Sequence, residues 1–237
     1  MRSKAALLCA VMLLSPLGAH AVRVNVTGYH QPPAIDVSVT GTSVSYTGPA
    51  GLLDGVVIDT FSSARASPSV LVAGPEPTAF LAFTAELTQT LKIGVPYDYA
   101  EVDGVTRFGA DKAADLSRLL GVAPTFVTDA ISSAAFQVAL WEIIYETGPG
   151  YDLGSGAFTG GPLTGDPATD AAFAQINTVL GYLDAYAPTV PVNALTNPTF
   201  QDLLVVTIPE PGSWALMLAG LGACGFAARR RRAAGSR

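Results

Sequence analysis

The 237-residue sequence predicts an α+β domain, an antiparallel β-sandwich or barrel with a three-helix layer, followed by one C-terminal transmembrane helix. Three observations predict this class. Residues 22–104 form short β-branched runs that alternate apolar and polar side chains between Gly and Pro, a pattern typical of antiparallel strands. Residues 110–187 show helical periodicity with capping residues. Residues 213–228 contain no charged side chain.

Strands are expected where side chains alternate, because a period of two places one row in a core and the other in water. The breaks at 41–42 and 49–51 indicate turns. A longer strand-like run covers 78–92, and a last strand covers 201–208. The four early strands are expected at 23–26, 36–40, 43–46 and 56–59.

Three helices follow the strands. The first covers about 110–120 and ends at Gly121, a residue suited to the position after a helix C-terminus. The second begins after Asp129, a predicted N-cap, and continues over 131–145. The third opens at Asp166-Pro167, which combines a capping carboxylate with proline in the first turn. Its apolar face consists of Phe173, Ile176, Leu180 and Leu183.

Charge excludes nucleic acid as a partner of residues 22–207, which form one predicted domain. The chain has 13 Lys and Arg, of which two lie near the N-terminus and five at the C-terminus, so six remain in this domain. Against these six stand 18 of the 19 Asp and Glu, which gives a formal charge near −12. Binding to a phosphate backbone needs the opposite sign.

Cysteine and histidine counts exclude further sites. Cys9 and Cys224 both fall in terminal apolar segments, so the domain has no disulfide, thiol nucleophile or Cys-ligated zinc. His30 is its only histidine, and a Ser-His-Asp triad would have to use it. We therefore expect no catalytic residues, no metal and no cofactor.

The N-terminus has the pattern of a secretory signal peptide over residues 1–21. Arg2 and Lys4 precede an apolar run that is too short to span a membrane. Ala19 and Ala21 form a small-x-small cleavage site at its end. Cleavage after Ala21 would make Val22 the first mature residue.

The C-terminus, residues 208–237, combines three features. Pro209-Glu210-Pro211 precedes the uncharged run 213–228, which as a helix would span roughly 24 Å. The cluster Arg229, Arg230, Arg231 and Arg232 follows as a membrane stop on the cytoplasmic side. A plain stop-transfer anchor does not require the Pro-Glu-Pro sequence.

These three features, in this order, resemble a PEP-CTERM sorting signal. The resemblance implies processing near Pro209-Glu210-Pro211 by an exosortase, a membrane-embedded enzyme, after export by the Sec machinery. It further implies passage through the inner membrane of a Gram-negative bacterium, transient anchoring there, and a final place at the cell surface or in the extracellular matrix. Extracellular polysaccharide of a biofilm is an expected partner.

The run 137–141 (Gln-Val-Ala-Leu-Trp) places Gln137 among apolar neighbours on a helix, where its amide needs hydrogen-bond partners. This run resembles the Gln motif of bacterial thioester domains, in which a Gln side chain condenses with a Cys of an upstream strand. Residues 196–204 resemble the closing strand of such proteins, and the similarity covers about 78–206. Thr84 stands where the family has Cys, so no thioester forms. Two states remain open: a hydrogen-bonded Thr84–Gln137 pair, or an ester activated by Glu86.

Two acidic groups offer weaker alternatives. Asp98, Glu101 and Asp103 suggest calcium, but Tyr99 interrupts the loop pattern, and a solvated acidic turn fits better. Glu142 and Glu146 lie one helical turn apart and could serve glycoside hydrolysis, although two exposed surface acids are the commoner arrangement.

Three functions follow, in order of preference. The first is an exported, exosortase-sorted surface or matrix protein without catalytic activity. The second is an adhesive or covalently cross-linked binding module derived from thioester domains. The third is a secreted carbohydrate hydrolase that uses Glu142 and Glu146.

Overall fold

The computed structural model describes residues 20–61 and 78–206 and has a closed six-stranded antiparallel barrel as its largest part. The strand order is β1-β4-β5-β9-β8-β6, so the barrel alternative is the one observed, in place of an open sandwich. The barrel strands are β1 (His20–Tyr29), β4 (Leu53–Phe61), β5 (Thr78–Thr84), β6 (Tyr97–Asp103), β8 (Asn193–Thr196) and β9 (Leu203–Val206).

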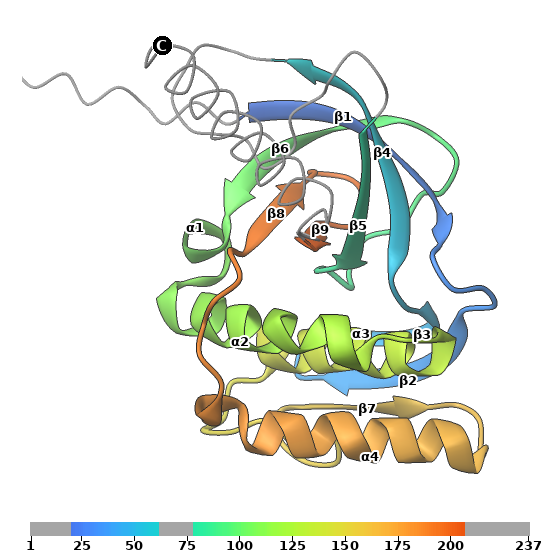
Figure 1. The fold of residues 1–237 in the computed structure, drawn as a ribbon, viewed down its shortest axis with the longest axis vertical. Helices are drawn as coiled ribbons and strands as arrows, with labels where there is room; N and C mark the ends of the chain where they lie inside the picture. Colours follow the sequence, from blue (N-terminus) through green and yellow to red (C-terminus); the bar gives the residue numbers. More distant parts are fainter. Residues whose placement is uncertain (1–19, 62–77, 207–237) are drawn as a thin grey trace, which may run out of the picture.

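A second sheet of three strands, in the order β3-β2-β7, lies apart from the barrel, with helices α2 and α3 between the two (Figure 1). It is formed by β2 (Ile35–Gly41), β3 (Ser45–Ala50) and β7 (Phe158–Pro162). The helices are α1 (Gly104–Phe108), α2 (Ala110–Phe126), α3 (Ala130–Tyr145) and α4 (Pro167–Gly181), followed by a 3₁₀ turn (Leu183–Ala185).

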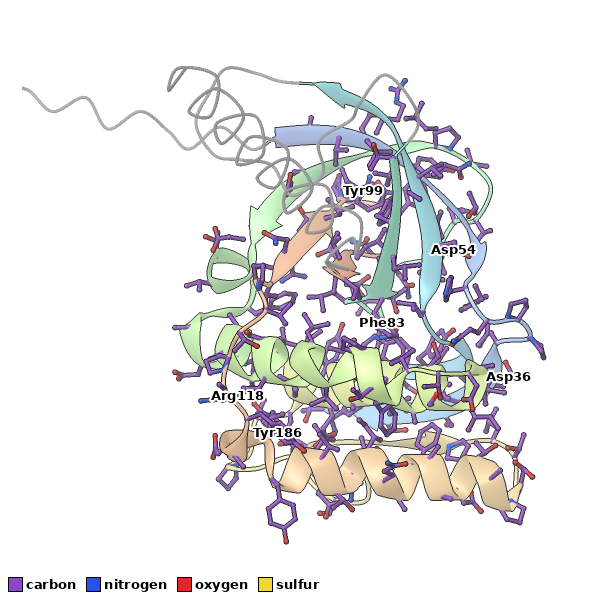
Figure 2. All side chains as sticks on the ribbon, in the orientation of Figure 1. Asp36, Asp54, Phe83, Tyr99, Arg118 and Tyr186 are labelled. Atoms are coloured by element: carbon purple, nitrogen blue, oxygen red, sulfur yellow. The ribbon has the colours of Figure 1, made fainter. Side chains whose placement is uncertain are left out.

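Helix α3 is the centre of the molecule, because it contacts α2, α4 and all three strands of the small sheet. Twelve of its sixteen residues are buried. Asp129 caps it as predicted, since its side chain accepts from the Ser132 N–H at 2.8 Å. Phe83, labelled in Figure 2, joins the barrel to this helix: its ring centroid lies 5.1 Å from that of Phe136.

Two predicted boundaries are wrong. Helix α2 continues past Gly121 to Phe126, because Ala123 and Phe126 are buried and their packing outweighs the local stop signal. The run 78–92 is a strand only as far as Thr84, where the chain turns away from the barrel.

The predicted acidic turn that contains Asp98, Glu101 and Asp103 is also wrong, because these three residues belong to strand β6. Asp98 lies opposite Arg23 of β1, and the two side chains form an ion pair at 2.6 Å. Asp103 ends the strand and caps α1 by accepting from the Thr106 N–H at 2.9 Å. Within residues 20–61 and 78–206, no group of three or more His, Cys, Asp or Glu side chains is placed to hold a metal ion.

Several sequence predictions concern residues that the structure does not describe. Residues 1–19, with Ala19 of the signal site, and residues 207–237, with the Pro-Glu-Pro sequence, the apolar run and the Arg cluster, lie outside the described residues. Ala21 belongs to strand β1 and lies between Phe61 of β4 and Ala100 of β6. None of the helices in the described part is long and apolar enough to cross a membrane.

Candidate binding site

The structure brings Thr84 and Gln137 together at the junction of barrel and helix. Thr84 is the last residue of β5, and Gln137 lies on the buried face of α3. Gln137 Oε1 accepts from the Thr84 N–H at 2.9 Å and from Thr84 Oγ1 at 3.2 Å, while Gln137 Nε2 donates to the Thr84 carbonyl at 2.8 Å. Strand residue and helix residue therefore hold each other through three hydrogen bonds.

Trp141 completes this arrangement one helical turn after Gln137. Its indole Nε1 donates to the Thr84 carbonyl at 2.9 Å, so that carbonyl accepts from two side chains of α3. Gln137 is fully buried and Thr84 is 6% exposed. The buried amide of Gln137 thus has the hydrogen-bond partners that it needs. They lie on β5, the strand that the thioester resemblance indicates.

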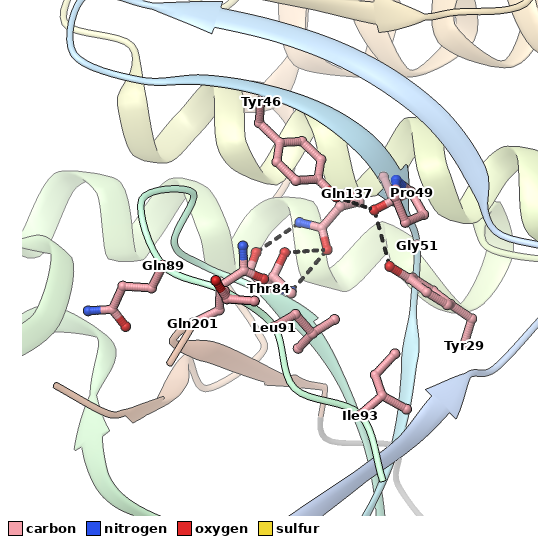
Figure 3. Close-up of a pocket in the computed structure, with 12 residues that line it drawn as sticks. Tyr29, Tyr46, Pro49, Gly51, Thr84, Gln89, Leu91, Ile93, Gln137 and Gln201 are labelled. Carbon is pink, nitrogen blue, oxygen red and sulfur yellow. Dashed lines mark hydrogen bonds between the residues drawn. The ribbon is translucent and has the colours of Figure 1, made fainter. Parts of the chain in front are cut away.

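The Thr84–Gln137 pair lines a cavity of about 430 Å³, here called the Thr84 cavity (Figure 3). Tyr29 of β1 and Tyr46 of β3 form part of its wall, and both hydroxyls donate to the Pro49 carbonyl, at 3.1 and 2.8 Å. Burial raises the pKa of both phenols, so both are neutral at physiological pH. The cavity is thus lined by residues of the barrel, the small sheet and α3.

Glu86 is not placed to activate Thr84. The chain leaves β5 at Thr84, and the Glu86 carboxylate accepts instead from Thr88 and from the Gln89 N–H, the latter at 2.8 Å. Glu86 therefore stabilises the loop that follows the strand. The expectation that Glu86 activates Thr84 is wrong, because β5 ends at Thr84 and is shorter than its alternating sequence indicates, so Glu86 lies beyond the strand.

Glu142 and Glu146 are buried, 0% and 3% exposed, so the expectation of two exposed surface acids is wrong. The two oxygens of Glu146 accept four backbone N–H groups, from Thr147, Gly148, Ala157 and Phe158. Glu142 Oε1 accepts from the Asp152 N–H at 2.9 Å, and its Oε2 has no hydrogen-bond partner. Both carboxylates hold the loop after α3 in place.

His30 is paired with Asp54, since its Nδ1 lies 2.8 Å from Asp54 Oδ1. Both side chains are more than 40% exposed. In the described part of the chain no serine hydrogen bonds to this imidazole, so the two residues do not extend to a Ser-His-Asp triad.

Sequence reasoning missed a buried ionic group at the start of β9. Asp202 is 6% exposed and accepts from Arg107 Nε and from the Asn197 N–H, each at 2.9 Å. This group connects α1 to the loop between β8 and β9. The sequence that could have indicated this group is Asn-Pro-Thr-Phe-Gln-Asp at 197–202, where Asn197 Oδ1 also accepts from the Thr199 N–H.

Comparison with protein families gives a match at the C-terminus. Residues 207–232 match the PEP-CTERM protein-sorting motif. None of the curated proteins or solved structures that were compared matches the chain. The motif starts directly after β9, whose last residue is Val206. The chain is thus an exported protein that carries a PEP-CTERM sorting motif at residues 207–232 and is targeted to an exosortase.

Proposed function

We propose that this protein is a surface or extracellular-matrix component without catalytic activity, delivered by exosortase processing of its C-terminus. The observation that carries the proposal is the sorting motif at 207–232. It directly follows the last barrel strand, and a signal-peptide pattern, residues 1–21, ends within the first two residues of β1. A folded domain flanked by two removable signals would be released as a compact unit of about 22–207.

The placement of the carboxylates supports a non-catalytic role. Glycoside hydrolysis requires two carboxyl groups that reach the substrate. Glu142 and Glu146 are buried and accept hydrogen bonds from the backbone of the following loop. Neither residue lines the Thr84 cavity.

Glu210→Ala is expected to abolish processing of the C-terminus. The wild-type protein, recovered from the envelope or medium of its own host, should begin at Val22 and end within 208–211, whereas the variant should retain 213–237. Intact-mass spectrometry measures both ends at once. The chain offers a matched control, because Pro75-Glu76-Pro77 repeats the tripeptide without the apolar run and Arg cluster. Glu76→Ala should be processed normally. A wild-type mass that includes 213–237 would contradict the proposal.

A second candidate function is a covalently cross-linked binding module, favoured by the Thr84–Gln137 contact. Attack of Thr84 Oγ1 on Gln137 Cδ would form an ester, break the Cδ–Nε2 bond and release ammonia. The native protein would then be lighter than its sequence by one ammonia, and Thr84→Val would have its full sequence mass. A wild-type mass equal to the sequence mass would leave the hydrogen-bonded pair as the native state.

A further inference from the structure

The Thr84 cavity is lined by neutral side chains only. Tyrosine, threonine, glutamine and aliphatic residues form its walls, and no Lys, Arg, His, Asp or Glu of the described chain lines it. This contrasts with a domain whose formal charge is near −12. A charged ligand would lose its hydration here without gaining a counter-charge, which disfavours its binding. The ligand that fits is therefore uncharged.

The cavity wall also includes an amide that is not engaged by the protein. Gln201 is 4% exposed, and no residue of the described chain forms a hydrogen bond with its side-chain amide. A ligand that covered this amide without a hydrogen bond would remove it from water at a cost in free energy. By contrast, Gln137 is fully engaged by Thr84. A purely apolar ligand would leave the Gln201 amide unpaired, so the ligand must carry hydrogen-bonding groups.

The remaining wall is aromatic and aliphatic. The hydroxyls of Tyr29 and Tyr46 both donate to the Pro49 carbonyl, so a ligand in the cavity would contact mainly the rings of these two residues. Tyr46 is held from behind by Trp141, with ring centroids 5.5 Å apart in an edge-on geometry. Ile93 is 44% exposed and lines the same cavity. Rigid rings beside amide groups suit a ligand with C–H faces and hydroxyl edges.

We propose that the Thr84 cavity binds a neutral sugar residue of an extracellular polysaccharide. A sugar hydroxyl both donates and accepts, which matches the free amide of Gln201. The C–H face of a pyranose can pack on Tyr29, and the cavity volume lies within the usual range for small-ligand sites. This inference rests on the proposed function, because a surface or matrix location is where the protein would meet such a polymer.

Titration of the mature host-derived protein with neutral hexasaccharides of glucose, galactose, mannose and N-acetylglucosamine tests the inference. Isothermal calorimetry should show saturable binding of at least one of them. An oligogalacturonate and hexanol serve as charged and apolar comparison probes, and neither should compete. Gln201→Leu removes the free amide and should weaken binding by roughly tenfold. Ile93→Ala, a change at an exposed position that cannot disturb the core, should weaken it several-fold.

Two matched controls separate cavity effects from general ones. Val95 is 48% exposed, two residues after Ile93, and does not line the cavity, so Val95→Ala should bind normally. Gln175 is exposed on α4, and Gln175→Leu should also bind normally. Absence of binding by all four sugars, equal affinity in Gln201→Leu and Ile93→Ala, or displacement by hexanol would each overturn the inference. Sorting is read from the C-terminal mass, so its failure would be seen separately from a failure of binding.

Discussion

Thr84→Cys is expected to create an internal thioester with Gln137, seen as a loss of one ammonia from the intact mass. The Thr84 N–H donates to Gln137 Oε1 at 2.9 Å, so it would stabilise the negative charge that develops on this oxygen during attack. Oγ1 already lies 3.2 Å from Oε1 of the same carboxamide. A thiol is a far better nucleophile than a hydroxyl, and the cysteine Sγ would replace that oxygen.

The atoms balance without a further reactant. The Sγ–Cδ bond forms, the Cδ–Nε2 bond breaks, and the thiol proton leaves with the amide nitrogen as ammonia. Methylamine should then open the thioester, add its own mass to the Gln137 acyl group and free one thiol. The mature chain has no other cysteine, since Cys9 and Cys224 lie in the terminal signals. Thiol titration therefore reports on this bond alone.

Ser117→Cys is the matched control for this experiment. Ser117 is a buried hydroxyl residue of α2 whose Oγ donates to the Val190 carbonyl at 2.6 Å. A cysteine there should keep its full mass and remain a thiol, as should Thr84→Cys combined with Gln137→Leu. A Thr84→Cys protein with full mass and one thiol in its folded state would contradict the thioester-domain resemblance.

Local signals predicted α2, α3 and α4 but not the short helix α1, and they failed where tertiary contacts determine the structure. Asp129 identified the start of α3, because a capping carboxylate acts within one turn. Strand β7 was not predicted, and its two glycines, Gly160 and Gly161, are residues that are depleted in strands. A Cβ on Gly160 would lie 2.7 Å from Val39 Cγ1 and 2.8 Å from Val138 Cγ1. This glycine therefore permits close packing of β7 between its neighbours, which no local rule reveals.

The candidate site was predicted only in part, for a similar reason. Thr84 and Gln137 were paired by a sequence motif, and the structure places them in contact. The cavity beside them also needs Tyr29, Tyr46 and Gln201, which come from three different strands or loops. Their proximity depends on closure of the barrel and on the position of the small sheet, so no sequence pattern indicates that they share a wall.

The wild-type protein is expected to lose stability as the pH rises from about 4.5 to 7, and Glu142→Gln is expected to remove most of this loss. Burial raises the pKa of Glu142 from 4.5 to about 7. In this window the folded protein keeps a proton that the unfolded chain releases, so the free energy of unfolding falls as the pH rises. The full loss is about 3 kcal/mol above pH 7. Gln stays neutral, so the variant should exceed the wild type by up to this amount at pH 8 and match it near pH 4.

Glu146→Gln provides a control of opposite sign one turn along the same helix. Burial alone would raise the pKa of Glu146. Its carboxylate also accepts hydrogen bonds from backbone N–H groups, and these lower the pKa by more than burial raises it. Its stabilising contribution is therefore present at neutral pH and lost on acidification. Replacement by Gln should destabilise the protein at pH 7, because an amide presents one acceptor oxygen to four donors. Urea unfolding of both variants from pH 4 to pH 8 measures these slopes. An unchanged slope in Glu142→Gln would show that the buried carboxyl does not control the pH dependence.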